Sequence, residues 1–88
     1  MDFYNLWIKR SAEKELRKFV PKEDLLRIVK KIQSLKSDPR PQGHEKLSGE
    51  EKFRVRQGNW RIVYKVDDLK KIVEIVKIGH RREVYRQI

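Results

Sequence analysis

The first half of the chain has the apolar spacing of one strand followed by two helices. Apolar and aromatic residues crowd positions 3–8 and predict the strand. Apolar residues then recur at helical spacing over 12–20, with Ser11 as the candidate N-cap. Pro21 ends this helix, and a second apolar stripe predicts a longer helix over 22–36. Helices joined at a proline predict a hairpin that packs its apolar face on a sheet.

The second half of the chain changes to the two-residue period of strands. Prolines and glycines over 37–49 predict a loop. Polar and apolar residues then alternate over 52–56 and 60–66, around a turn at 57–59. The last predicted strand, 71–78, is apolar on both faces, which is typical of a central strand that is covered on both sides.

These elements predict an α+β fold. Its order is an N-terminal strand, a two-helix hairpin and a three-strand antiparallel meander, with both helices packed on one face of the sheet. A short basic tail follows over 80–88. A chain of 88 residues suffices for one compact domain and not for two, so 1–88 is predicted to be a single domain.

The net charge points to a polyanionic partner. Lys and Arg number 23 against 13 Asp and Glu, which gives a net charge of +10. So high a charge on a short chain costs self-repulsion, and nucleic acid is the usual partner that relieves it. An acidic protein partner fits the same charge, and a merely well-solvated surface is the alternative.

The composition also excludes several chemistries. The chain has no Cys, so disulfides, thiolate metal sites and a Cys nucleophile are excluded. His44 and His80 lie far apart without ligand-spaced partners, so neither a metal nor another cofactor is expected. No run approaches the ~20 apolar residues that span a bilayer. We therefore expect a cytoplasmic protein that does not contact a membrane.

The predicted hairpin gathers basic side chains on one face. If Gly58 and Asn59 form a two-residue turn, Arg56 lies opposite Arg61. Because side chains alternate between faces, six of them project together, and we call this set the cationic plate. It comprises Lys52, Arg54, Arg56, Arg61, Val63 and Lys65. Like charges opposite one another destabilise a hairpin, and no acid interrupts the plate, which favours anion binding over a merely solvated face.

The segment after the last predicted strand adds candidate chemistry. Antiparallel pairing brings the end of that strand, at Gly79, close to Arg61. His80, Arg81 and Tyr85 would then supply a base, an acid and a phosphate clamp. This set suits RNA cleavage without metal, in which a 2′-hydroxyl attacks the adjacent phosphate and arginines stabilise the developing charge. The alternative for Tyr85 is an aromatic ring docked on the core.

Two motifs resemble the RelE toxins of the RelE/ParE superfamily. The run 52–64 resembles their central hairpin, and 76–85 resembles their C-terminal segment. The pair Lys46-Leu47 also fits their loop. The resemblance covers the whole chain, with its specific part in the second half. It implies a RelE-type fold, a type II toxin that cleaves mRNA in the ribosomal A site, and a cognate RelB-like antitoxin that wraps the toxin and blocks its site.

The resemblance also implies roles for individual residues. Arg61 and Arg81 would stabilise the phosphorane and the leaving group, and Tyr85 would be the general base. Lys52 and Arg54 would hold RNA and help to lower the pKa of the tyrosine. The other expected RNA-binding residues are Arg56, Lys46 and Arg82.

Two departures from the family pattern leave undecided which residue acts as the general base. Family members often have Lys at the positions of Arg54 and His80. The segment between Arg81 and Tyr85 is shorter than in some relatives, so His80 could share the acid or base role. Other functions also stay open: a ParE-like gyrase inhibitor on the same fold, a non-catalytic RNA-binding module, and a degenerate toxin that still binds its antitoxin.

Overall fold

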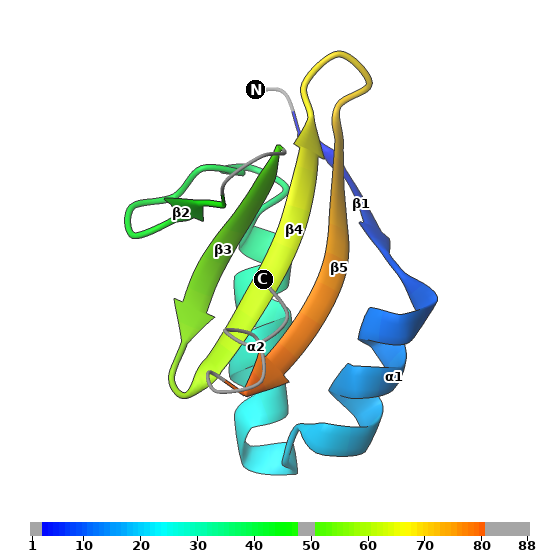
Figure 1. The fold of residues 1–88 in the computed structure, drawn as a ribbon, viewed down its shortest axis with the longest axis vertical. Helices are drawn as coiled ribbons and strands as arrows, with labels where there is room; N and C mark the ends of the chain where they lie inside the picture. Colours follow the sequence, from blue (N-terminus) through cyan, green and yellow to red (C-terminus); the bar gives the residue numbers. More distant parts are fainter. Residues whose placement is uncertain (1–2, 48–50, 81–88) are drawn as a thin grey trace.

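The computed structural model describes residues 3–47 and 51–80, and all of its helices and strands lie within those ranges. They are β1 (Asn5–Ile8), α1 (Arg10–Phe19), α2 (Lys22–Ser34), β2 (Glu45–Lys46), β3 (Lys52–Gln57), β4 (Trp60–Asp67) and β5 (Ile72–His80). This order confirms the predicted strand, helix pair and meander (Figure 1). The short β2 is an addition, because it lies inside the predicted loop.

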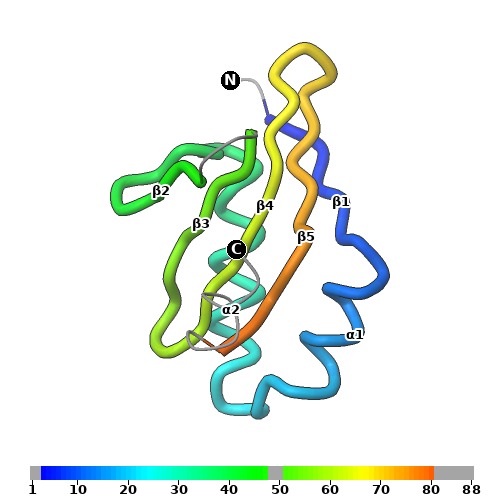
Figure 2. The backbone as a smooth tube through the Cα atoms, in the orientation of Figure 1, coloured from blue at the N-terminus to red at the C-terminus, as the bar shows by residue number. Residues whose placement is uncertain are grey.

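The strands form one mixed sheet in the order β1-β5-β4-β3-β2. β3, β4 and β5 pair antiparallel, as predicted. β1 pairs in parallel with β5, and the helix hairpin carries the chain from β1 at one edge of the sheet to β2 at the other. The backbone trace in Figure 2 follows β5 between β1 and β4. Its central place explains why β5 is apolar on both faces.

One hydrophobic core lies between the helices and one face of the sheet. α2 lies behind β3 and β4 in Figure 1, and α1 lies along β5. Both helices supply buried residues to this core, together with alternate residues of β3 and β4. The core contains Ala12, Val20, Ile28, Ile32, Leu35, Phe53, Val55, Ile62, Tyr64, Val66, Val73, Ile75 and Ile78. We call the opposite side of the sheet the open face.

The start of α1 differs from the prediction. Lys9, not Ser11, is the N-cap, and it makes no side-chain capping bond. The reason lies in the sheet, because the Lys9 amide donates to the Ile75 carbonyl at 2.9 Å and its own carbonyl accepts from the Glu13 amide at 2.9 Å. The backbone therefore turns directly from β1 into the helix, and Ser11 falls inside it.

A β-bulge interrupts the pairing of β4 with β5. Val63 pairs with Lys77 and Tyr64 pairs with Ile75, so Val76 has no partner on β4. An extra residue of this kind shifts the alternation of side chains by one position. As a result Ile75 and Ile78, three residues apart, are both buried in the core.

Glu15 of α1 ties the helix to the part of β5 that β1 does not cover. Its carboxylate accepts a hydrogen bond from the Ile78 amide at 3.2 Å and forms an ion pair with the Lys77 ammonium. A strand edge without a partner leaves backbone donors to be satisfied. Glu15 satisfies one of them and fixes α1 against β5.

A polar clamp around Asp68 joins three segments that lie far apart in the sequence. The Tyr4 hydroxyl donates to Asp68 Oδ1 at 2.5 Å, and the Arg40 guanidinium donates to both carboxylate oxygens at 3.2 and 2.8 Å. Hydrogen bonds from Arg40, and then from Tyr4, lower the pKa of Asp68 to about 2. The clamp holds the N-terminal segment, the loop before β2 and the β4–β5 turn together.

Tyr64 anchors the same loop from inside the core. Its side chain is fully buried, and its hydroxyl donates to the Pro39 carbonyl at 2.7 Å. Burial raises the pKa of Tyr64 to about 12, so the hydroxyl remains a donor at any ordinary pH. The loop is thereby fixed beside β3.

We expect Asp68→Asn to lower the urea midpoint at neutral pH, because it removes the charge that pairs with Arg40. The pKa of Asp68 is depressed from 3.8 to about 2, so its contribution to stability is present above pH 4 and is lost as the pH falls toward 2. The difference in midpoint between the variant and the wild type should therefore shrink across that range. Glu51→Gln, which removes an exposed carboxylate, is the control; an equal loss there would contradict a specific clamp.

Tyr64→Phe should destabilise the protein by about 1 kcal/mol, because it removes one buried hydrogen bond and leaves the Pro39 carbonyl without its donor. Chemical denaturation at neutral pH measures the change, and the slope with denaturant should stay constant. An unchanged free energy of unfolding would mean that this hydrogen bond does not contribute to stability.

Candidate nucleic-acid interface

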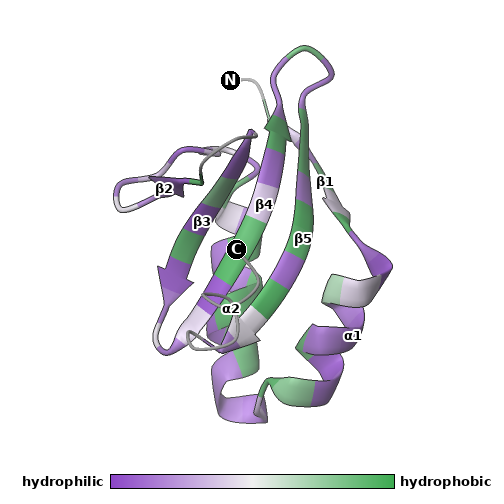
Figure 3. Cartoon of the chain, in the orientation of Figure 1, coloured by the Kyte–Doolittle hydropathy of each residue, from purple (hydrophilic) through white to green (hydrophobic). Residues whose placement is uncertain are grey.

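The β3–β4 hairpin confirms the predicted register. Arg56 pairs with Arg61, Arg54 with Val63, and Lys52 with Lys65. Gly58 adopts a φ of +61° in the turn, a conformation that glycine reaches without strain. The intervening residues enter the core, so the cationic plate projects from the open face. Hydrophilic and hydrophobic residues alternate along β3 and β4 in Figure 3.

Two guanidinium groups of the plate are largely buried. The exposed fraction is 8% for Arg54 and 5% for Arg61, whereas Arg56 is exposed. Arg54 donates to Glu45 of β2 at 2.8 Å, and Arg61 donates to the Trp60 carbonyl at 3.3 Å. Partial removal from water strengthens the field of a cation at close range, which distinguishes these two guanidinium groups from the exposed Arg56.

Acids from neighbouring strands reach the plate, which corrects the expectation that none interrupts it. Glu45 of β2 lies opposite Arg54 and forms an ion pair with it. Glu74 of β5 lies opposite Lys65. The hairpin itself contains no acid over 52–66. The acids come from β2 and β5, whose positions beside the hairpin follow from the topology of the sheet.

A cavity of about 320 Å³ opens beside the hairpin at Arg56 and Arg61. Lys31 of α2 also lines it, which places three cations around one hollow. The remaining lining residues are Gln42, Gly43, Glu45 and Val55. Lys31 was not among the predicted site residues, because nothing in the spacing of α2 shows which strand it will lie against.

An apolar cluster occupies the middle of the open face. Leu47 and Val63 are buried against each other, and Val76 packs on them. Lys46, the residue before Leu47, is exposed and lies opposite Phe53. Paired residues share a face, so Lys46 lies on the side of the sheet away from Arg54. The structure therefore does not bring Lys46 into the plate.

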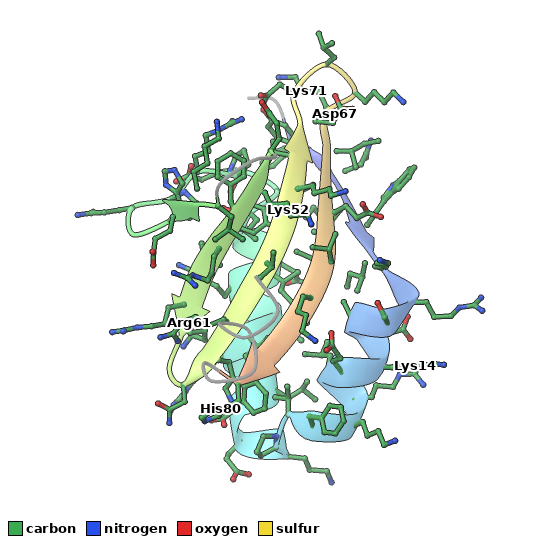
Figure 4. All side chains as sticks on the ribbon, in the orientation of Figure 1. Lys14, Lys52, Arg61, Asp67, Lys71 and His80 are labelled. Atoms are coloured by element: carbon green, nitrogen blue, oxygen red, sulfur yellow. The ribbon has the colours of Figure 1, made fainter. Side chains whose placement is uncertain are left out.

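The end of β5 reaches the neighbourhood of Arg61, as predicted. Gly79 lies opposite Arg61 and His80 lies opposite Trp60. The rings of Trp60 and His80 meet edge to face with centroids 5.8 Å apart, and the Trp60 indole donates to Asp24 of α2 at 3.2 Å. His80 therefore lies on the helix side of the sheet, and the plate lies on the other. Figure 4 labels His80 and Arg61 at this end of the sheet.

Arg81, Arg82 and Tyr85 lie outside the described residues, so their predicted roles stay predictions. Within the described ranges, no group of three or more His, Asp or Glu side chains could hold a metal ion. Over the same part of the chain, no helix is long and apolar enough to cross a membrane.

Comparison with known proteins agrees with this architecture. The family model described as "ParE toxin of type II toxin-antitoxin system, parDE" matches residues 7–85. The RelBE2 toxin–antitoxin complex of Mycobacterium tuberculosis contains a chain that is 27% identical, with a TM-score of 0.78 over 90% of this chain and 99% of that one. No curated protein matches the chain.

Two further solved structures have the same fold. One is the archaeal RelE–RelB complex of Pyrococcus horikoshii OT3, with 27% identity and a TM-score of 0.80 over 90% of this chain and 96% of that one. Another is the isolated RelE toxin of E. coli, with 29% identity and a TM-score of 0.76 over 96% and 93%. Because the family model spans almost the whole sequence and the fold matches RelE toxins, the chain belongs to the ParE toxin family of type II toxin–antitoxin systems, within the RelE/ParE superfamily.

Proposed function

We propose that this toxin is a metal-independent endoribonuclease that cleaves mRNA in the ribosomal A site. The observation that carries the proposal is the pairing of Arg61 with Gly79, which brings the end of β5 next to the cationic plate. Arg81 and Tyr85 follow β5 in the sequence. Together with the cations of the plate, they supply the groups that phosphodiester cleavage needs.

The proposed reaction is an internal transfer at the RNA backbone. The 2′-oxygen loses its proton to a general base and bonds to the adjacent phosphorus. The bond from phosphorus to the 5′-oxygen breaks, and that oxygen takes a proton. The products are a 2′,3′-cyclic phosphate and a free 5′-hydroxyl. Arg61 and Arg81 stabilise the negative charge of the phosphorane.

The base is assigned to Tyr85, and His80 is the second candidate. The ring of His80 rests against Trp60 on the helix side of the sheet, which favours the tyrosine. An ordinary tyrosine has a pKa of about 10 and needs nearby cations to become a base. Lys52 and Arg54 are the plate residues proposed for that task.

The remaining basic residues are proposed to bind the RNA backbone. Arg56 is exposed beside Arg61 and can reach a phosphate. Arg82 is proposed as a further phosphate contact. Lys46 contacts the RNA only where the RNA passes around the β2 edge, because this residue lies on the other side of the sheet.

The proposed protein partner is a RelB-like antitoxin. The solved relatives include RelE–RelB complexes from a bacterium and from archaea, which supports an antitoxin for this toxin as well. A net charge of +10 favours an acidic partner that covers the plate. We place the toxin and its antitoxin in the cytoplasm, where translating ribosomes are found.

A ParE-like gyrase inhibitor is the second candidate, and one observation favours it. The matching family model is the one for ParE toxins. Such a toxin binds a protein target and does not need cations gathered around Arg61. The two functions separate experimentally, because one damages mRNA and the other damages DNA. A non-catalytic RNA-binding module would damage neither.

Primer extension on a translated mRNA tests the proposal. Purified toxin is added with and without ribosomes, in buffer that contains a chelator, and the new ends are analysed. Cuts that require ribosomes and leave a 2′,3′-cyclic or 3′-phosphate support the nuclease. If the toxin still poisons its host while the mRNA stays intact, the result would favour the gyrase inhibitor over the nuclease.

Arg61→Ala and Arg81→Ala should each reduce the cleavage rate by on the order of 10²-fold at saturating ribosome concentration, because a cation that stabilises the phosphorane is removed. Ribosome binding, measured by co-sedimentation, should fall much less. Arg27→Ala removes one charge from an exposed position on α2 and serves as the matched control. Equal losses in binding and in cleavage would mean that these arginines only position the RNA.

Tyr85→Phe and His80→Gln separate the two candidate bases. Loss of a general base typically costs about 10² to 10⁴-fold in rate. We expect that loss in Tyr85→Phe, together with loss of the rise in rate with pH that tyrosine ionisation gives, whereas His80→Gln should retain most activity. The reverse pattern would assign the base to His80.

A further inference from the structure

Trp7 is an exposed aromatic residue on the open face, outside the cationic plate. Trp7 of β1 pairs with Glu74 of β5. Glu74 pairs in turn with Lys65 of β4, and Lys65 pairs with Lys52 of β3. These residues form one row across the sheet and share a face. The neighbouring row, with Leu6 opposite Val73, packs into the core. The Trp7 residue remains 58% exposed, although tryptophan is strongly stabilised by burial.

The surface around Trp7 forms a cavity of about 800 Å³. Leu69 and Ile72 are its apolar lining residues beside Trp7, and the side chain of Val66 below them faces the core. The charged lining residues are the lysines Lys65 and Lys70 and the acids Glu51, Asp67, Asp68 and Glu74. Pockets of this size, mostly apolar with a few polar groups, are typical of sites for small organic groups. Glu74 faces Lys65, the plate residue nearest to Trp7, and the acids that line the pocket outnumber its lysines. The pocket therefore lacks the positive excess found around Arg61.

We propose that Trp7, Glu74 and Lys65 form a nucleobase-binding site. The Trp7 indole stacks on the base, Glu74 accepts a hydrogen bond from the exocyclic amino group, and Lys65 binds the adjacent phosphate. The class of ligand is therefore a nucleotide of single-stranded RNA whose base has an amino group, with cytosine the best fit. This inference rests on the proposed function, since it names where that RNA continues from Lys65, at one end of the plate, toward β1.

The spacing fits one strand of RNA that crosses the open face. Lys65 follows Arg61 by four residues along β4, which is about 13 Å, and Trp7 lies two strands to the side, which is about 10 Å. The base held by Trp7 is thus a few nucleotides from the phosphate at Arg61. The phosphates lie over the cations, and the uncharged base lies over the acidic pocket, where a carboxylate can accept from its amino group.

The surroundings of Trp7 favour a base over an apolar side chain of a protein partner. Apolar groups that cover Glu74 and Lys65 would remove water from both charges. They would offer no hydrogen bonds in place of those that water had made. A nucleotide offers an amino donor to the carboxylate and a phosphate to the ammonium. It therefore satisfies both charges while its flat ring covers the indole.

Intrinsic fluorescence tests the site without any cleavage. The probe is a hexanucleotide of cytidines with 2′-O-methyl groups, which cannot be cut by 2′-oxygen attack. We expect it to quench the wild-type protein, and we expect most of the quenching to disappear in Trp7→Phe, in which Trp60 remains. Trp7→Ala should weaken binding by about 5- to 100-fold, the usual cost of losing one stacked base. Phe19→Ala removes an aromatic residue of equal exposure, 59%, from α1 and should bind as the wild type does.

Base selectivity gives a second readout that does not depend on the stability of a Trp7 variant. The cytidine probe should bind more tightly than the matching uridine probe, and Glu74→Leu should abolish that preference. Binding that depends on Arg61 but leaves Trp7 fluorescence unchanged would overturn the site. Weaker antitoxin binding by Trp7→Ala with unchanged oligonucleotide affinity would overturn it too, and would assign Trp7 to a protein interface. Quenching and selectivity in a toxin that cuts no mRNA would support the site while refuting the nuclease.

Discussion

The pairing of β5 with β4 on one side and with β1 on the other is the constraint on which the candidate site depends. It sets Gly79 opposite Arg61, so that the end of β5 lies beside the plate. The same pairing sets Glu74 between Lys65 and Trp7. The bulge at Val76 lets both ends of β5 keep their apolar residues in the core. Without it, one end would turn its apolar side chains to the open face, because side chains alternate along a strand.

The open face combines two chemical environments on one rigid support. Near Arg61 the guanidinium groups are partly buried, so their field on a phosphate is strong. Near Trp7 the lining acids outnumber the lysines, and the surface suits an uncharged ring with an amino group. Leu47, Val63 and Val76 separate the two regions with an apolar patch. In the proposed complex, the RNA presents a phosphate near Arg61 and a base near Trp7.

The side chains that hold the loop before β2 contribute to stability and also help to position the plate. Arg40 and Tyr4 hold Asp68, and Tyr64 holds Pro39, so the loop is fixed against the sheet at two points. That loop leads into β2, which brings Glu45 to Arg54. The fixed loop therefore helps to order Arg54 of the plate. A change in the clamp around Asp68 should alter the position of Arg54 through this connection.

The sequence by itself determined the two helices, the four longer strands and the hairpin register, but not the short β2. Alternation around Gly58, strict over 52–56 and broken at Val63 over 60–66, indicates which side chains share a face, because a slip by one residue would bury the charges. Tertiary structure alone decided what lies beside the hairpin: Glu45 on Arg54, Lys31 near Arg61, His80 against Trp60, and Trp7 in one row with Lys65. These neighbours are far apart in the sequence, and no local pattern records them. They follow from the order of strands in the sheet and the position of the helices, which depend on how the whole core packs.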